Sequence, residues 1–149
     1  MVHGGNETVN AICDHPDISA VAFVGSDAGG RHVHARASAA GKRVQANMGA
    51  KNHAVVMPDA PREATLAALA GAAFGAAGQR CMAISAAVFV GGVAPWVDDL
   101  AAKARELALG AGGEAGTDVG PLISPAATAR AVRLVDAAEA AGAKVVVDG

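Results

Sequence analysis

The chain has 149 residues, with 12 Lys and Arg against 14 Asp and Glu and a formal net charge of −2. The basic residues are not clustered, so the sequence has no electrostatic footprint for nucleic acid, and no apolar stretch is long enough to span a bilayer. No signal peptide is visible, and two cysteines, Cys13 and Cys81, form neither a disulfide framework nor a metal-ligand spacing. We therefore expect a cytoplasmic protein with no nucleic-acid or membrane partner and no metal.

The first 40 residues are predicted to contain two helices and one strand, because the apolar period changes between 3.6 and 2. The run Ala20–Val24 is apolar without interruption and ends at Gly25, which is typical of a buried strand. Ser26 or Asp27 would begin the second helix and Gly41 would end it as its C-cap. The helices expected here are residues 5–13 and 27–40.

The rest of the chain continues the alternation of strands and helices. Strands are expected at 43–47, 53–57, 84–90 and 143–147. Helices are expected from Pro61 to Ala76, from Pro95 to Gly110 with Trp96, Leu100, Ala104 and Leu107 on one face, and from Ser124 to Gly142 with Val132 and Val135 pointing inward. This alternation predicts an α/β fold with a mainly parallel sheet covered on both faces.

A glycine-rich turn follows the strand at 20–24 and opens the next helix, with the sequence Gly25-Ser26-Asp27-Ala28-Gly29-Gly30. Helix N–H groups in this position can receive a phosphate. The spacing is neither the dinucleotide fingerprint nor a P-loop, so a plain tight turn also accounts for it. The connection Asn47-Met48-Gly49-Ala50-Lys51-Asn52 joins two strands, and Gly49 would allow a ligand to approach the backbone closely; a plain connection is the alternative.

Cys81 is the candidate nucleophile, in the run Gly75-Ala76-Ala77-Gly78-Gln79-Arg80-Cys81-Met82-Ala83. A thiolate attacks more readily than a thiol, and a neighbouring arginine favours the thiolate. Flanking glycines leave backbone N–H groups free to stabilise an oxyanion. The alternative is a buried structural cysteine. Cys13 precedes Asp14, whose charge disfavours a thiolate, so we expect Cys13 to be structural.

These motifs together resemble the aldehyde dehydrogenase superfamily and, within it, the CoA-acylating methylmalonate-semialdehyde (malonate-semialdehyde) dehydrogenases. The similarity runs in order over essentially the whole chain. The residues that carry it are Phe23 to Ser26, Gly41 to Gln45, Asn47 to His53, Gly71 to Gly75, Gly78 to Ala83 and Gly120 to Ile123.

The resemblance implies roles for seven positions. Cys81 would attack the aldehyde carbon and carry the thioester formed when hydride passes to NAD, and its backbone N–H would form part of the oxyanion hole. Arg80 would meet the substrate carboxylate. The cofactor would lie against Gly25, Ser26 and Gly30 at its pyrophosphate and against Met48 and Gly49 at its nicotinamide half.

Asn47 stands where hydrolytic aldehyde dehydrogenases carry a glutamate that activates water. An amide does not titrate at neutral pH, so the thioester would wait for CoA instead. The implied products are propionyl-CoA or acetyl-CoA and CO2, as in breakdown of valine or related compounds. An unusual hydrolytic aldehyde dehydrogenase and a non-catalytic remnant are the alternatives.

Family members are much longer than this chain and are commonly homo-oligomers. The resemblance therefore implies an internal fragment, with residues 1–49 from the end of an NAD-binding domain and residues 50–149 from the start of a catalytic domain. We expect the isolated chain to be weakly active or inactive. The preferred semialdehyde, the pathway and the oligomeric state stay open.

Overall fold

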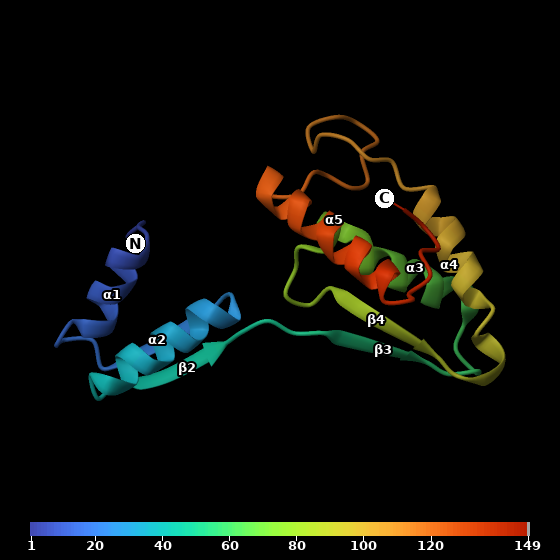
Figure 1. The fold of residues 1–149 in the computed structure, drawn as a ribbon. Coiled ribbons are helices and arrows are strands. Elements are labelled where there is room, and N and C mark those ends of the chain that lie inside the picture. Colours follow the sequence, from blue (N-terminus) through green and yellow to red (C-terminus); the bar gives the residue numbers. More distant parts are fainter. Residues whose placement is uncertain (149) are drawn as a thin grey trace. The chain divides into compact units, whose positions relative to one another are not determined.

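The structure is a computed structural model that describes residues 1–148, and the chain divides into two compact units (Figure 1). The first unit is Met1–Ala50 and the second begins at Lys51. Strands pair in parallel within each unit, so the predicted α/β class is confirmed. No helix among residues 1–148 has the length and apolar character needed to cross a membrane.

The first unit contains helices α1 (Asn6–Asp14) and α2 (Asp27–Ala39) and strands β1 (Ala20–Val24) and β2 (Arg43–Asn47). The strands run parallel, in register from Ala20 opposite Arg43 to Val24 opposite Asn47, with α2 as the crossover between them. The core is built around Cys13, Val33 and Ala37, each at most 2% exposed. Cys13 is therefore a structural cysteine, as we predicted from the charge of its neighbour Asp14.

Both ends of α2 lie where the sequence places them. The Ser26 hydroxyl accepts a hydrogen bond from the Gly29 N–H at 3.2 Å, which caps the first turn. At the other end Gly41 has a φ of +74°, a value that favours glycine. The N–H of Gly41 donates to Ser38 and that of Lys42 donates to Ala37, which is the Schellman arrangement of hydrogen bonds.

The expectation of a buried strand and a sheet covered on both faces is wrong for this unit. β1 and β2 alternate between half-buried and exposed positions, and Val24 is 74% exposed. Val21, Phe23 and Val44 face the core beneath the helices, whereas the first unit itself provides no layer over the opposite face of its two-stranded sheet. An uninterrupted apolar run therefore indicated a strand correctly, but not its burial within this chain.

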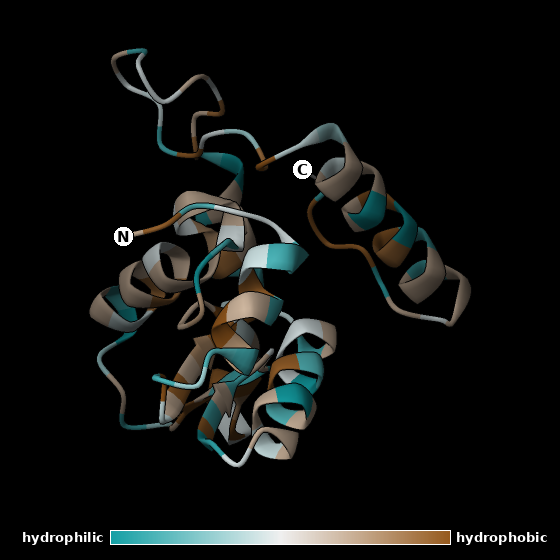
Figure 2. Cartoon of the chain, turned by 90° about the vertical axis from the view of Figure 1, so that its left-hand side faces the viewer, coloured by the Kyte–Doolittle hydropathy of each residue, from teal (hydrophilic) through white to brown (hydrophobic). Residues whose placement is uncertain are grey.

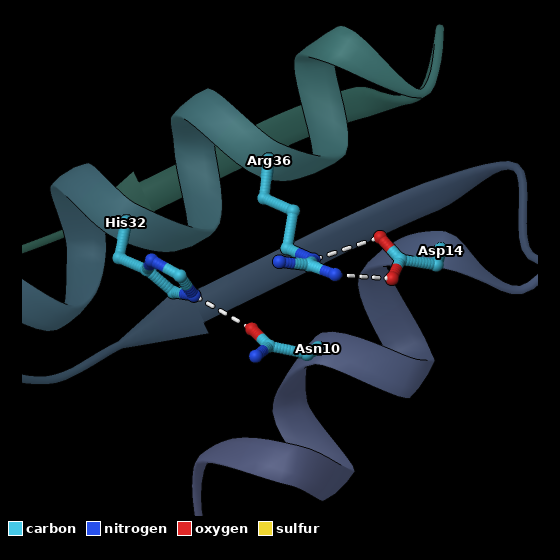
Figure 3. A network of polar contacts seen from close by, with 4 residues as sticks. All are labelled: Asn10, Asp14, His32 and Arg36. Atoms are coloured by element: carbon cyan, nitrogen blue, oxygen red, sulfur yellow. Dashed lines mark hydrogen bonds and ion pairs between the residues drawn. The ribbon is translucent and has the colours of Figure 1, made fainter.

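Two polar contacts join α1 to α2, as Figure 3 shows. His32 Nε2 lies 2.7 Å from Asn10 Oδ1. One helical turn further along, the Arg36 guanidinium donates two hydrogen bonds to the Asp14 carboxylate, at 2.8 and 2.6 Å. The hydrogen bond from Arg36 holds the pKa of Asp14 below its usual value of 3.8.

We expect Asp14→Asn to lower the stability of the first unit slightly at neutral pH and not at strongly acidic pH. Because the folded-state pKa of Asp14 lies below that of the unfolded chain, the pair stabilises the fold above pH 3.8 and stops doing so as the pH falls through the folded-state pKa. Urea midpoints of the two proteins at about pH 7 and about pH 1.5 measure this. Asp17→Asn is the matched control, and an equal Asp14→Asn deficit at both pH values would contradict the prediction.

The second unit contains β3 (Asn52–Val56), α3 (Arg62–Phe74), the 3-10 turn η1 (Gly75–Gly78), β4 (Ile84–Phe89), the turn η2 (Gly91–Val93), α4 (Trp96–Arg105) and α5 (Pro125–Ala140). β3 and β4 are parallel neighbours, and a register shift separates Asn52, opposite Ile84, from His53, opposite Ala86. Val56, Leu69 and Val93 form the centre of its core. The loop that carries Cys81 lies between η1 and β4.

Three predictions about this unit are wrong. α4 ends at Arg105 and not at Gly110. Residues 143–147 form no strand, because a strand needs a paired neighbour and the structure gives this segment none among residues 1–148. Val132 and Val135 on α5 are 54% and 46% exposed, and Figure 2 shows hydrophobic residues along this helix. α5 does begin after the predicted Ser124 cap, and the predicted glycine, Gly142 with a φ of +96°, follows its last residue Ala140 and the C-cap Ala141.

Candidate active site

The side chain of Cys81 is exposed, on the loop that leads from η1 into β4. The alternative of a buried structural cysteine is therefore wrong for this residue. Its neighbour Met82 is also exposed, at 77%. Since neither side chain packs into the core, the position of the thiol depends on how the backbone of the loop is held.

The backbone before Cys81 is strained. The sequence predicts a helix continuing to Ala76, but α3 ends at Phe74, and Ala76 and Ala77 adopt left-handed values of φ, +53° and +52°. Gly78 follows at +71°. A left-handed conformation costs an alanine roughly 1–2 kcal/mol. Strain of this kind persists only where the surroundings hold the chain in place, and it is common at functional sites.

Ala76→Gly is expected to be at least about 1 kcal/mol less destabilising than Ala67→Gly. Both changes remove one methyl group and free the unfolded chain equally, but Ala76 is left-handed whereas Ala67 lies inside α3, where glycine costs about 1 kcal/mol. Denaturant unfolding of the two variants measures the difference. Equal losses would show that the left-handed alanine carries no strain.

Arg80 lies against the end of α3. Its Nη2 donates to the carbonyl oxygen of Gly71, and the carbonyl oxygen of Ala72 is 3.4 Å away. A Cβ added to Gly75 would stand 2.4 Å from the same nitrogen, so the glycine makes room for the guanidinium. The Gly71 carbonyl also accepts from the Gly75 N–H, so Arg80 adds a second hydrogen bond near the end of α3. The side chain places a permanent positive charge on the residue next to Cys81.

Gln79 ties the cysteine loop to a second segment of the same unit. Its Nε2 donates to the carbonyl oxygen of Ala76 at 3.1 Å and to that of Pro121 at 3.4 Å, and its Oε1 accepts from the Ile123 N–H at 2.8 Å. Sequence reasoning gave Gln79 no role. Its place two residues before Cys81 was the available signal, since a side-chain amide there can bond to neighbouring backbone on both sides.

The five residues predicted at the cofactor lie together in the first unit, around the start of α2. Gly25 and Ser26 precede the helix, and Gly30 lies in its first turns. Gly30 is buried, and a Cβ there would stand 2.4 Å from Cγ of Met48, so the loop after β2 packs directly on the helix. The Gly49 N–H donates to Asp27 Oδ1 at 2.8 Å, a link that the sequence analysis did not foresee.

An anionic diphosphate fits this arrangement. The Ser26 hydroxyl binds the Gly29 N–H, while the first N–H groups of a helix have no partner within the helix. These N–H groups and the helix dipole favour an anion. The Asp27 carboxylate opposes an anion at this position, and its hydrogen bond with Gly49 directs part of its charge toward the backbone.

The chain is thus a parallel α/β protein with an exposed cysteine on a hydrogen-bonded loop and a glycine-rich helix start. The sequence profile of the aldehyde dehydrogenase family matches residues 1–149. The chain belongs to the aldehyde dehydrogenase family.

Within this family the chain is similar to proteins that are named methylmalonate-semialdehyde dehydrogenases. It is 55% identical over all 149 residues to the methylmalonate-semialdehyde/malonate-semialdehyde dehydrogenase [acylating], mitochondrial, of Rattus norvegicus, and covers 28% of that protein. Two crystal structures superpose closely. One is a protein of Sinorhizobium meliloti 1021, complexed with NAD and provisionally named a methylmalonate-semialdehyde dehydrogenase (TM-score 0.94, 44% identity, 99% of this chain and 30% of that one). The other is the methylmalonate-semialdehyde dehydrogenase of Oceanimonas doudoroffii (TM-score 0.90, 43% identity, 99% and 31%).

Proposed function

We propose that this chain supplies the nucleophile and part of the NAD site for the CoA-acylating oxidation of methylmalonate or malonate semialdehyde. The observation that carries the proposal is the exposed thiol of Cys81 on a loop fixed by side-chain hydrogen bonds. The chain spans under a third of the length of the relatives it matches, so the activity of a whole enzyme is part of the proposal.

In the proposed reaction the Cys81 sulfur forms a bond to the aldehyde carbon and gives a thiohemiacetal. NAD, when bound, supplies the acceptor for the two electrons lost as the thiohemiacetal becomes a thioester. The Cys81 backbone N–H would stabilise the oxygen that becomes negative during the attack. Gly25, Ser26 and Gly30 would hold the cofactor pyrophosphate, and Met48 and Gly49 would lie near its nicotinamide half.

Loss of CO2 from the carboxylated acyl group breaks a carbon–carbon bond, and the carbon left behind takes up a proton. The thiol of CoA then attacks the thioester carbonyl, and the bond to the Cys81 sulfur breaks. Propionyl-CoA or acetyl-CoA leaves, and the cysteine is free for another cycle. Arg80 would pair with the substrate carboxylate through the N–H groups that α3 does not use.

Asn47 supports transfer to CoA over hydrolysis. It lies at the end of β2, and its amide cannot take a proton from water. We propose a homo-oligomeric assembly for the full-length enzyme, and a role in valine breakdown. A cytoplasmic location is our proposal for this chain, whereas the rat relative is named as mitochondrial.

The test places this chain in a complete enzyme. In the grafted enzyme, these 149 residues replace the matched segment of the rat relative. We expect NADH and an acyl-CoA to form from methylmalonate semialdehyde, NAD and CoA, with little turnover when CoA is omitted. Free carboxylic acid formed at the same rate without CoA would favour a hydrolytic enzyme. A folded grafted enzyme that forms no NADH would favour the non-catalytic alternative.

A further inference from the structure

Asn52 begins β3 and reaches across to the loop that carries Cys81. Its Nδ2 donates to the carbonyl oxygen of Cys81 at 2.8 Å and to that of Ala83 at 3.0 Å. A side-chain amide nitrogen has two N–H groups, so this geometry uses both. One side chain thus holds the backbone on either side of Met82.

The strand pairing explains why a side chain is needed at this place. β4 begins at Ile84, so Cys81 and Ala83 precede the paired residues. The register shift between Asn52 and His53 interrupts the ladder at its first step. The Asn52 amide continues the hydrogen bonding beyond the end of the ladder, where the backbone of β3 no longer matches its neighbour.

Packing does not hold the nucleophile's own residues. The Cys81 side chain is exposed and Met82 is 77% exposed, so burial gives this stretch little order. The Ala83 N–H donates to the Arg80 carbonyl at 3.1 Å, which closes a turn around Cys81. A turn of this kind can form with the central peptide, Cys81–Met82, in either of two orientations. The hydrogen bond from Asn52 to the Cys81 carbonyl selects one of these orientations.

We propose that Asn52 is a positioning residue for Cys81: its amide fixes the Cys81 carbonyl and thereby the direction in which the thiol and the neighbouring backbone N–H project. This inference rests on the proposed function, because it makes Asn52 the residue that positions Cys81, the nucleophile of that reaction. A misplacement of about 1 Å can slow a reaction about 100-fold, so a side chain that never meets the substrate controls the rate.

The experiment measures acyl transfer to Cys81 in the grafted enzyme without any cofactor. With p-nitrophenyl acetate, the Cys81 sulfur bonds to the acetyl carbon, the ester bond to the aryl oxygen breaks, and p-nitrophenolate leaves in a burst. The burst amplitude counts competent sites and its rate constant reports their positioning. Asn52→Ala and Asn52→Asp both remove the two donors, and aspartate also keeps the volume.

Both variants are expected to keep the amplitude and to lose about 10- to 100-fold in the burst rate constant. The matched control is His53→Ala, the next residue, whose Nδ1 lies 2.7 Å from the Lys51 carbonyl and which makes no hydrogen bond to the Cys81 loop; it should react as the unmodified protein does. In the 149-residue chain, hydrogen exchange over residues 80–83 should accelerate in Asn52→Ala and not in His53→Ala.

An unchanged rate constant in Asn52→Ala and Asn52→Asp would overturn the proposal, and so would a normal rate in Asn52→Asp alone, because aspartate has no donor. The proposal would also be overturned if the burst amplitude fell while the rate constant stayed unchanged, or if both variants gave no burst at all. Either result would assign Asn52 a purely structural role. The proposed function fails separately, if the unmodified protein gives no burst or if the burst survives in Cys81→Ala.

Discussion

Cys81→Ala in the grafted enzyme is expected to abolish NADH formation, with a loss of about 10⁶-fold, because the variant has no catalytic nucleophile. The proposed reaction needs a covalent bond from the Cys81 sulfur to the aldehyde carbon, and a methyl group cannot form one. Because Cys81 is exposed, the substitution leaves no cavity and should not change the melting temperature. NADH absorbance and thermal melting, measured on the same preparation, separate loss of chemistry from loss of fold.

Cys13→Ala is the matched control. Cys13 is 1% exposed and packs against Val33 and Ala37, so its truncation should lower stability by roughly 1 kcal/mol and leave the rate of the folded enzyme unchanged. Iodoacetamide should label Cys81 and not Cys13 in the native protein. Turnover that persisted in Cys81→Ala would contradict the assignment of Cys81 as the nucleophile.

Asn47→Glu is expected to make the grafted enzyme release carboxylic acid without CoA, with a gain of at least about 100-fold in CoA-independent turnover. The resemblance places this position where hydrolytic relatives carry their water-activating glutamate. A carboxylate there can remove a proton from water, which an amide cannot do. The quantities to compare are acid and acyl-CoA formed per NADH, with and without CoA.

Asn47→Gln separates the chemistry from the change of size. Glutamine has the length of glutamate but no basic group, so hydrolysis should stay at the level of the unmodified protein. Equal gains in both variants would show that added bulk, and not a general base, opens the thioester to water. No gain in Asn47→Glu, with acyl-CoA formation retained, would remove Asn47 from the explanation of CoA dependence.

Local signals in the sequence were enough to predict most elements and their ends. Ser26 and Ser124 cap helices, and Gly41 and Gly142 end them with positive φ, because each of these roles depends on a few consecutive residues. The burial of Cys13 was also predicted correctly, whereas for Cys81 the neighbouring residues left a buried cysteine as an alternative, which its exposure contradicts. The burial of Ala20–Val24, the inward face of α5 and the strand at 143–147 were predicted wrongly, since each needed a partner surface that no local pattern specifies.

The residues of the candidate site also divide into those that local sequence signals predict and those that only the folded chain identifies. Cys81 and the glycine-rich start of α2 stand out in the sequence because nucleophiles and tight turns require particular residue types. Asn52 and Gln79 do not stand out, because a side-chain amide acquires its role only when distant carbonyl groups come within reach.

By itself, the sequence determined the order of strands and helices as far as α5, the family and the identity of the candidate nucleophile, all of which depend on residue type and spacing. Only the tertiary structure decided which faces are covered, that α3 gives way to a left-handed turn at Ala76 and Ala77, and that the amide of Asn52 holds the carbonyl of Cys81 from 29 positions away. The reason is physical: propensity acts over neighbouring residues, whereas burial and long-range hydrogen bonds exist only once separate segments have packed together.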